Sequence, residues 1–241
     1  MLRRSIFLVV AALCAASCGG GSTSSATSAP AKPDVPWFEE RAAASGIDFV
    51  HFNGVSGEYY YPEIMAPGVG LIDYDNDGDL DVYLVQSQML GKKTIKDALF
   101  PPKGPLQDRL YRNDLTVAGD GSRKLHFTDV TDQAGINIET YGMGLAAADV
   151  DNDGFVDIYR TGLTESVLLH NNGNGTFTDV TAKSSVGNKG GWGVSASFVD
   201  IDRDGWLDLF VGNYLLYTIE GDIDCLSVTG QHDYCPPNSY R

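Results

Sequence analysis

The stretch GLAAADVDNDGFVDIYRT, residues 144–161, decides the fold, because two other parts of the chain repeat its pattern. Residues 68–85 read GVGLIDYDNDGDLDVYLV, and residues 194–211 read VSASFVDIDRDGWLDLFV. Each stretch contains D-x-D-x-D-G-x-x-D, followed by an apolar residue and an aromatic one. Such self-similarity indicates a repeat protein, and the length of the repeat is the next thing to establish.

A second signature sets the length of the repeat. HFTDVTDQAGI begins at His126, TFTDVTAKSSV begins 50 residues later at Thr176, and WFEERAAASGI from Trp37 is a divergent relative. The aspartate patterns that begin at Asp149 and Asp200 are 51 residues apart. Both signatures therefore give a period of about 50 residues.

The first repeat is longer than this period. Asp73 and Asp149 are 76 residues apart, which predicts an insertion from about residue 86 to residue 108. This stretch contains Pro101-Pro102 and Gly104-Pro105, and such dipeptides are typical of surface loops.

The rest of each repeat has the composition of short β-strands. Apolar and aromatic runs are bounded by Gly, Asn and Asp, and the turn at residues 172–175, NGNG, predicts a β-hairpin. A unit of this length, built from short strands and repeated at a fixed period, is typical of a propeller blade. We expect an all-β fold with β-propeller repeats, of which about three blades are present, so the ring is incomplete in this chain. The alternative is an open β-solenoid, whose calcium-binding repeats are much shorter.

The aspartate loops, residues 73–81, 149–157 and 200–208, carry the ligands that Ca²⁺ prefers. Calcium takes about 6 to 8 oxygen ligands. We expect the side chains at loop positions 1, 3, 5 and 9 and the carbonyl at position 7 to bind about three ions, with a glycine at position 6 that allows the sharp turn. The predicted ligands are Asp73, Asp75, Asp77, Asp81 and the carbonyl of Asp79; Asp149, Asp151, Asp153, Asp157 and the carbonyl of Phe155; and Asp200, Asp202, Asp204, Asp208 and the carbonyl of Trp206.

Two other interpretations of these loops are weaker. An EF-hand needs a glutamate at position 12 and helices on both sides, but Leu84, Arg160 and Val211 stand there. Solvated turns without metal are the second alternative, and three complete copies argue against it. Because four carboxylates in a small volume repel one another, we expect the ions to be part of the fold.

The N-terminus has the features of an export signal. Residues 1–18 begin with two arginines, continue with a short apolar run and end in small residues before Cys18. We predict a lipoprotein-type signal with lipidation of Cys18, and ordinary signal-peptide cleavage is the alternative. Residues 19–36 are rich in Gly, Ser and Pro and are predicted to be a disordered tether. The repeat region would then be residues 37–241, exported and either lipid-anchored to a bacterial membrane or secreted.

The charge of the chain limits its partners. The formal net charge is −15, from 17 basic and 32 acidic residues. Nucleic acids and anionic membranes require clustered Lys and Arg, so we expect neither as a partner, and contact with a membrane only through Cys18. Cation binding fits the sign of the charge.

Two cysteines lie outside the export segment. Cys225 and Cys235 are close in sequence in a chain bound for an oxidising compartment, which predicts a disulfide. Zinc binding by these cysteines and His232 is the alternative, although no fourth ligand at the spacing of a metal site is evident.

The combined motifs resemble a known family. The aspartate loops with their glycine-rich strands resemble the FG-GAP or VCBS repeats of integrin-like propellers. Together with F-T-D-V-T and the C-x9-C segment that ends in Cys235-Pro236-Pro237, they are similar to bacterial proteins related to cartilage acidic protein. The resemblance covers residues 37–241 and implies an exported, calcium-bound propeller, usually followed by an ASPIC/UnbV domain. Since Tyr240 aligns with Tyr111 just before an expected hairpin, we interpret the chain as an N-terminal fragment.

The sequence does not predict an enzyme. It contains no nucleophile elbow, phosphate loop or H-E-x-x-H motif, and its four histidines are scattered. The leading hypothesis is a calcium-binding module that acts in binding, adhesion or scaffolding at the cell surface, with an extracellular protein or glycan as ligand. Candidate contact surfaces are residues 59–62, YYYP, and the insertion. The alternative is a calcium-dependent propeller enzyme that acts on polysaccharide.

Overall fold

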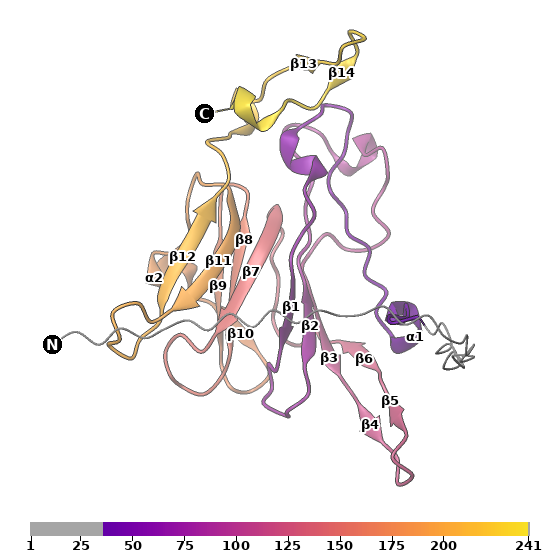
Figure 1. Ribbon diagram of the computed structural model, residues 1–241, viewed down its shortest axis with the longest axis vertical. Helices are drawn as coiled ribbons and strands as arrows, with labels where there is room; N and C mark the ends of the chain where they lie inside the picture. The colour runs from indigo at the N-terminus through magenta and orange to yellow at the C-terminus, as the bar shows by residue number, and fades with distance from the viewer. Residues whose placement is uncertain (1–35, 241) are drawn as a thin grey trace, which may run out of the picture. The chain divides into compact units, whose positions relative to one another are not determined.

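The structure is a computed structural model that describes residues 36–240 (Figure 1). The predicted signal of residues 1–18, the lipidation site Cys18 and the tether up to residue 35 lie outside the described residues. The chain divides into two compact units, residues 1–40 and 41–241. In the first unit the described residues 36–40 contain no helix or strand, and all elements below belong to the second unit.

Two antiparallel sheets of four strands each form most of the second unit. In both, each strand pairs with the next strand of the sheet. The first sheet consists of β1 (Val69–Ile72), β2 (Asp81–Leu84), β3 (Arg109–Asn113) and β6 (Phe127–Asp129). The second consists of β7 (Gly142–Ala148), β8 (Asp157–Gly162), β9 (Val167–Asn171) and β10 (Phe177–Asp179). Sheets with this up-and-down order are the units of a β-propeller, as the repeat pattern predicts.

The remaining elements are smaller. A third sheet contains two strands, β11 (Gly193–Val199) and β12 (Asp208–Asn213), so residues 36–240 form no closed ring. Two short hairpins pair β4 (Thr116–Val117) with β5 (Arg123–Lys124) and β13 (Cys225–Leu226) with β14 (His232–Asp233). The helices are short: α1 (Ala42–Ser45), α2 (Thr181–Ser184), and the 3₁₀ turns η1 (Tyr61–Ile64), η2 (Ile95–Asp97), η3 (Ile219–Gly221) and η4 (Pro237–Ser239). The expected all-β class is confirmed.

Each sequence signature has a fixed place in a sheet. The three aspartate loops join the first strand of a sheet to its second strand, and the F-T-D residues of the second signature form the last strand, β6 or β10. The residues from 85 to 108 separate β2 from β3 and correspond to the predicted insertion. Gln86 and Ser87 at its start and Asp108 at its end are buried, so only its middle is a surface loop.

The main core lies between the first and second sheets. Apolar side chains from both sheets form one buried cluster, among them Tyr83, Leu110, Ile158 and Leu169. Fully buried side chains of this kind each contribute about 1.5–3 kcal/mol to folding. Packing of successive sheets against each other therefore stabilises the repeats.

A buried ion pair crosses the same boundary. Arg160 of β8 donates from Nε to Asp108 Oδ2 at 3.1 Å, and neither side chain is exposed. The hydroxyl of Tyr83 and the backbone N–H of Gln86 also donate to Asp108, each at 2.8 Å. Because the charges are both paired and hydrogen-bonded, they can remain in the interior. The sequence analysis did not predict this pair.

A second core cluster is aromatic and lies at the end of the sheets opposite the aspartate loops. Trp192 is fully buried against Tyr61, Tyr214 and Tyr217. Tyr240 also packs against Tyr61 and Tyr217 and is not in a strand, so its alignment with Tyr111 of β3 does not correspond to the structure. Only part of the YYYP segment is surface, because Tyr61 is buried while Tyr59 and Tyr60 remain half-buried.

The C-terminal hairpin is closed by a disulfide. Cys225 and Cys235 are bonded to each other, with 5.3 Å between their Cα atoms. This bond leaves neither cysteine as a thiolate for the zinc alternative. We call residues 225–235 the disulfide loop.

Candidate functional site

The three aspartate loops share one backbone conformation. The glycine at loop position 6 has a φ of +92° in Gly78 and Gly154 and of +93° in Gly205. An L-residue with a side chain is strained at such angles, so the sixth position requires glycine. The residue at position 4 also has a positive φ, between 58° and 64°, in Asn76, Asn152 and Arg203.

Backbone N–H groups orient the first aspartate of each loop. In the first loop Asp73 accepts from the N–H of Asp77 at 3.1 Å and from that of Gly78 at 3.0 Å. The same two bonds are made to Asp149 and to Asp200. The carboxylate at position 1 therefore has the same orientation in all three loops.

The ninth position connects the loop to its sheet. Asp81 accepts from the N–H of Tyr74 at 3.0 Å and from that of Asn113 in β3 at 2.8 Å. Asp157 makes the corresponding bonds to Val150 at 3.0 Å and to Asn171 in β9 at 2.7 Å. Asp208 makes the first bond, to Ile201 at 3.1 Å.

The two buried aspartates have raised pKa values. Burial, with a smaller effect of the carboxylates of Asp75 and Asp77, raises the pKa of Asp81 to about 6. Burial likewise raises the pKa of Asp157, although the neighbouring backbone N–H groups oppose this. A cation among these carboxylates would favour their ionised form.

The first, third and ninth positions come together in every loop. Their ligand atoms lie within 4.8 Å of one another in three groups: Asp73, Asp75 and Asp81; Asp149, Asp151 and Asp157; and Asp200, Asp202 and Asp208. The fifth position is outside these groups, and one of its oxygens accepts the N–H of position 7 at 2.8–2.9 Å, in Asp77, Asp153 and Asp204. Of the predicted side-chain ligands, three in each loop are therefore clustered without any ion.

His170 is a group that the ligand prediction missed. Its Nδ1 lies 3.1 Å from Asp157 Oδ1 and 3.5 Å from Asp151 Oδ2, and it forms a further cluster with Asp151 and Asp153. The signal was present in the sequence, because LLHN at residues 168–171 aligns with LYRN at 110–113, which places Arg112 at the same point of the first repeat.

The donor set fits a hard divalent cation. Within each group of three carboxylates all ligand atoms are oxygen, which suits Ca²⁺ better than the softer transition metals. In the first loop Asp75 Oδ1 is buried and has no hydrogen-bond partner among the described residues. A buried carboxylate oxygen normally has a partner, so this one is available to a ligand.

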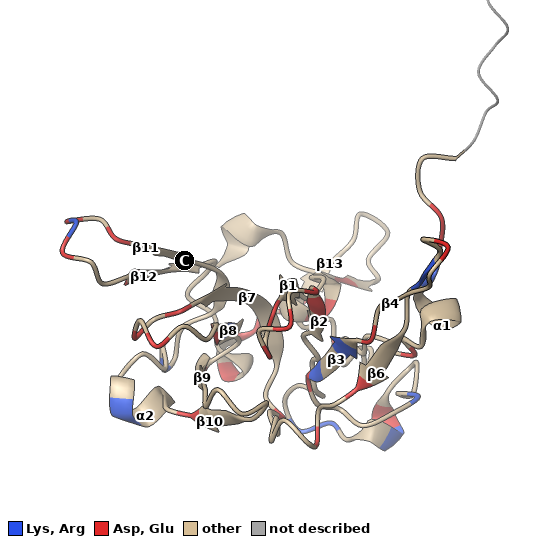
Figure 2. Ribbon diagram, turned by 90° about the horizontal axis from the view of Figure 1, so that it is seen from below, with Lys and Arg blue, Asp and Glu red and all other residues tan. Residues whose placement is uncertain are grey.

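Neighbouring loops are linked to each other. Asn76 Nδ2 donates to the carbonyl of Gly154 at 2.9 Å, and Asn152 Nδ2 donates to that of Gly205 at 3.1 Å. Each bond joins position 4 of one loop to position 6 of the next, while Arg203 replaces asparagine in the third loop. Figure 2 views this side of the chain and shows acidic residues at the tip that joins β11 and β12.

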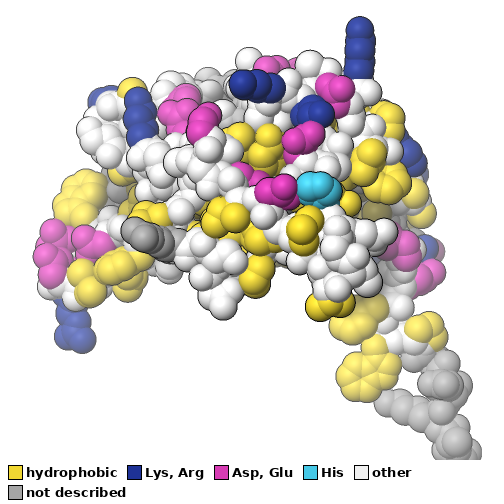
Figure 3. Space-filling view, turned by 90° about the horizontal axis from the view of Figure 1, so that it is seen from above, with side chains coloured by type: hydrophobic (Ala, Val, Ile, Leu, Met, Phe, Trp, Pro, Cys, Tyr) yellow, Lys and Arg dark blue, Asp and Glu magenta, His cyan; other side chains and the backbone are white. Residues whose placement is uncertain are grey.

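Two adjoining pockets lie at the opposite end of the sheets, where the disulfide loop and η1 are found (Figure 1). One, of about 460 Å³, is lined by Gly57, Glu58, Tyr59, Tyr60, Ile219, Asp222, Ile223, Asp224 and His232. The other, of about 740 Å³, is lined by Glu58, Tyr60, Gly91, Lys92, Lys93, Ile219 and Glu220. We call them the tyrosine pocket and the lysine pocket. Figure 3 shows this face, on which a histidine lies against an acidic side chain among hydrophobic ones.

A buried carboxylate supports the wall of the tyrosine pocket. Glu63 is 2% exposed, and Tyr234 of the disulfide loop donates to its Oε2 at 3.1 Å. Burial raises the pKa of Glu63 to about 7, and the hydrogen bond from Tyr234 opposes the shift. The rings of Tyr234 and Tyr59 pack edge to face, with a centroid distance of 5.2 Å.

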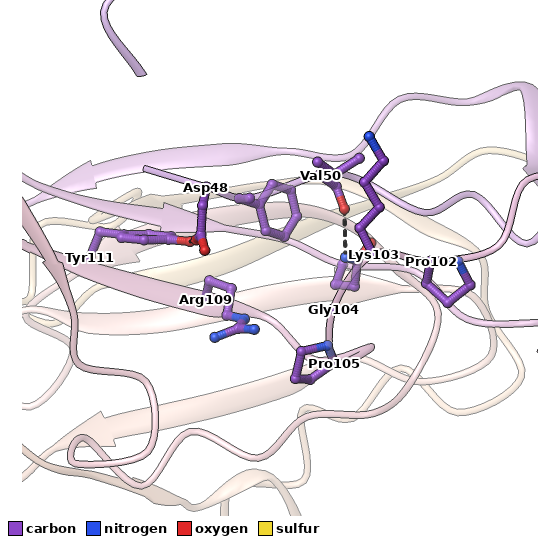
Figure 4. A pocket seen from close by; sticks show the side chains of 10 residues that line it. Asp48, Val50, Pro102, Lys103, Gly104, Pro105, Arg109 and Tyr111 are labelled. Carbon is purple, nitrogen blue, oxygen red and sulfur yellow. Dashed lines mark hydrogen bonds between the residues drawn. The ribbon is translucent and has the colours of Figure 1, made fainter. Parts of the chain in front are cut away.

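A further cavity, of about 200 Å³, lies under the insertion (Figure 4). Several of its polar lining residues already have partners: Tyr111 donates to Asp48 at 2.8 Å, Arg109 forms an ion pair with Asp129 outside the lining, and Gln86 donates to the carbonyl of Val50 at 3.2 Å. Because these groups are already satisfied, they leave little for a ligand to complete in this cavity.

No helix within residues 36–240 has the length and apolar character needed to cross a membrane.

Comparison with known proteins gives one family. Residues 162–211 match the model of the FG-GAP-like repeat. This match begins at the end of β8 and ends within β12, so it covers one period of the chain in a different phase from the sheets. FG-GAP repeats form β-propellers, and the match therefore confirms the repeat family and fold class that the sequence predicted.

The chain is also similar to Cartilage acidic protein 1 from three vertebrates. It is 33% identical to the Mus musculus protein and 32% identical to the Homo sapiens protein over 99 residues, which cover 40% of this chain and 15% of each relative. Identity to the Xenopus tropicalis protein is 30% over 106 residues, which cover 44% of this chain and 16% of the relative. The matched part thus spans about a sixth of the length of these relatives. Together the matches support an extracellular repeat module.

Proposed function

We propose that this chain is a calcium-stabilised module of an extracellular binding protein, with one Ca²⁺ in each aspartate loop. The observation that carries the proposal is the threefold recurrence of one geometry, in which three carboxylates per loop lie within 4.8 Å of one another. Like charges at such distances repel, and a divalent cation converts the repulsion into attraction. The repeat match supports the same type of module.

The residues have separate roles in this proposal. Positions 1, 3 and 9 supply the clustered carboxylates, and position 5 supplies the carboxylate oxygen that is not used by the N–H of position 7. The carbonyls of Asp79, Phe155 and Trp206 complete the oxygen set. Because Asp81 and Asp157 also bond to β3 and β9, an ion in the loop would tie three strands of a sheet together.

Calcium removal tests the proposal. Thermal unfolding is measured with Ca²⁺ and with excess chelator, and calorimetric titration of the calcium-free chain counts the sites. When the free Ca²⁺ concentration is a hundred times the Kd of a site, binding adds about 2.7 kcal/mol of stability, so we expect a large fall in Tm on chelation. The titration should count about three sites. An unchanged melting curve in chelator would contradict the proposal. Mg²⁺ is the control ion, and we expect it to restore less stability because it keeps its water ligands.

We further propose that the module acts in adhesion or scaffolding at the cell surface through the end of the sheets opposite the loops. The two adjoining pockets there support a contact with an extracellular protein or glycan. Lipidation of Cys18 would attach the exported chain to a membrane. The substitution Cys18→Ser should release the protein from the membrane fraction of expressing cells. If the signal peptide is cleaved in the ordinary way, the substitution should not change the amount of protein in that fraction.

The alternative of a calcium-dependent enzyme acting on polysaccharide stays a prediction. Incubation of the calcium-loaded chain with a panel of glycans distinguishes an enzyme from a binding module. Turnover that is lost on mutation outside the aspartate loops would favour the enzyme, and stable binding without turnover favours the module.

A further inference from the structure

The second aspartate loop differs from the other two by one side chain from a neighbouring strand. His170 belongs to β9, opposite Thr178 of β10, and its ring lies against the loop that joins β7 to β8. Nδ1 of His170 is 3.1 Å from Asp157 Oδ1 and 3.5 Å from Asp151 Oδ2. The second loop therefore has a ring nitrogen beside its carboxylates.

This nitrogen makes the donor set of the loop a mixed one. Ligand atoms of Asp151, Asp153 and His170 lie within 4.8 Å of one another, and Asp151 also belongs to the group formed with Asp149 and Asp157. Among the groups of potential ligands in residues 36–240, this is the one that includes a histidine. Because the two groups share Asp151, the imidazole and the carboxylates border the same space.

The distances within the cluster suit a small metal ion. Two ligands that are each about 2.1 Å from a zinc ion are about 3.0 Å apart at a right angle and about 3.4 Å apart at the tetrahedral angle. The separations of His170 Nδ1 from Asp157 and Asp151, 3.1 and 3.5 Å, are close to these values. Nδ1 is at hydrogen-bond distance from Asp157, and an ion bound to this nitrogen would take the place of the hydrogen between them. Neutral imidazole is a common ligand of Zn²⁺, whereas Ca²⁺ takes oxygen ligands.

The first loop has a side chain at the same point that cannot bind a metal. Arg112 of β3 aligns with His170, and its Nε is paired with Asp114 Oδ1 at 2.8 Å. A guanidinium group stays protonated and has no free electron pair for a cation. Beside the third loop, β12 pairs with β11 alone among the described strands, so no equivalent of β9 is seen there. Loops of one backbone geometry thus differ in the residue that a third strand supplies.

The imidazole is held in place by its strand. β9 lies between β8 and β10, and the next residue, Asn171, is buried and donates from Nδ2 to the carbonyls of Tyr74 at 2.8 Å and Val156 at 3.2 Å. The side chains of His170 and Asp151 are 28% and 49% exposed, so an ion can reach them from solvent. A ligand that is already positioned loses less entropy when the ion binds.

We propose that the second aspartate loop binds Zn²⁺ in preference to Ca²⁺, with the ring nitrogen of His170 added to the carboxylates of the loop, while the first and third loops keep Ca²⁺. A site with imidazole and carboxylate ligands also favours Zn²⁺ over Mn²⁺, since affinity for divalent metals rises along that series. This inference rests on the proposed function, because it assigns the metal of one of the three proposed sites.

Zinc binding in the presence of calcium tests the inference. The untagged chain is dialysed against Zn²⁺ in excess Ca²⁺, and the bound zinc is measured by atomic absorption. We expect about one Zn²⁺ per chain, and an X-ray absorption spectrum at the zinc edge that shows an imidazole ligand. No bound zinc, or zinc with oxygen ligands alone, would overturn the inference. This measurement needs no variant.

A pair of histidine variants locates the site. His170→Gln can still donate a hydrogen bond to Asp157 but is a poor zinc ligand, so it should bind Zn²⁺ at least about tenfold more weakly with unchanged Ca²⁺ affinity. The control is His126→Gln, which removes an exposed histidine outside the loops and should leave zinc binding as it is. Full zinc affinity in His170→Gln, or equal weakening in the control, would show that His170 only orients Asp157.

The reciprocal variant tests whether this position selects the metal. Arg112→His places an imidazole at the same point of the first repeat and should add a second zinc site, counted by the same dialysis. A chain that folds but gains no zinc site would contradict the inference. Circular dichroism of each variant establishes that it is folded.

Calcium titration of the same samples separates this inference from the proposed function. Calcium binding at about three sites, with zinc binding that does not depend on His170, overturns only the inference. Absence of calcium binding overturns the proposed function, whatever zinc does.

Discussion

Strands β8 and β12 occupy the same place in successive repeats, yet β8 is buried along its whole length and β12 is largely exposed. Their sequences are similar, DIYRTG at residues 157–162 and DLFVGN at 208–213. Tyr159 is fully buried, whereas the equivalent Phe210 is 50% exposed. β8 has a strand on each side, while β12 pairs with β11 alone among the described strands. Burial in this chain is therefore decided by neighbouring strands and sheets more than by the strand's own residues.

The largest effect should come from the ion pair that only β8 makes. Arg160→Met leaves Asp108 as an unpaired charge in the core, and such changes cost about 3–5 kcal/mol. Val211 is the equivalent residue of β12, and Val211→Met should change the free energy of unfolding by less than about 1 kcal/mol. Urea unfolding of both variants measures the difference. Similar losses in the two would show that the comparison of the strands is mistaken.

The ninth loop position should give the next effect. Asp157→Ala removes the acceptor of the N–H groups of Val150 and Asn171 and should cost about 2–3 kcal/mol in calcium-free buffer. Asp208→Ala removes only the exposed bond from Ile201 and should cost less than about 1 kcal/mol. Chemical denaturation in chelator is the measurement, since calcium would add its own contribution. A larger loss of stability in Asp208→Ala than in Asp157→Ala would contradict this prediction.

Two glutamates that are five residues apart in sequence extend the comparison to pH. Glu63 is buried with a pKa raised to about 7 from an ordinary value of 4.5, while Glu58 is exposed. A raised pKa of an acid means that its ionisation destabilises the fold. The protonated Glu63 carboxyl therefore contributes stability that is fully present below about pH 4.5 and is lost as the pH rises to about 7. Glu63→Gln should therefore gain stability relative to wild type over this range, on the order of 1–3 kcal/mol.

Glu58→Gln is the control for this pH series. Its difference from wild type should stay nearly constant, since Glu58 forms a surface pair with Lys93 and such pairs contribute little. Thermal or urea unfolding at several pH values gives both curves. A flat difference for Glu63→Gln would show that the burial of this carboxyl does not affect its ionisation.

The smallest effect should come from the bonds between the loops. Asn152→Gly keeps the positive φ but removes the bond to Gly205, which should cost up to about 1 kcal/mol. At the equivalent position of the third loop, Arg203→Gly replaces a residue that is strained at a positive φ by one that is not. This substitution should not lower the free energy of unfolding. Differential scanning calorimetry can resolve the two. Loss of stability in Arg203→Gly alone would contradict this account of the fourth position.

Much of the fold was predictable because it repeats. The period of about 50 residues, the placement of the aspartate loops between two strands and the F-T-D strands β6 and β10 follow from patterns that are visible in one copy and checked by the next. The clustering of loop positions 1, 3 and 9 brings together three of the predicted ligands in each loop, since it depends on local turns, and binding of Ca²⁺ there stays a prediction. His170 was missed because it comes from another strand, at a place where the first repeat has Arg112.

Features that join distant segments were not predictable. Arg160 and Asp108 are 52 residues apart in sequence, and no pattern marks either as a buried charge. Tyr234 and Glu63 are 171 residues apart, and Glu63 was indistinguishable from Glu58 in the sequence.

The sequence by itself determined the repeat, the all-β class and the acidic loops, because each depends on residues within one turn or one strand. Only the tertiary structure decided which of two similar strands is buried, which carboxyl lies in the core and where an acidic pocket forms. The physical reason is that burial and electrostatic environment depend on surfaces contributed by other segments, and residue type alone does not specify them.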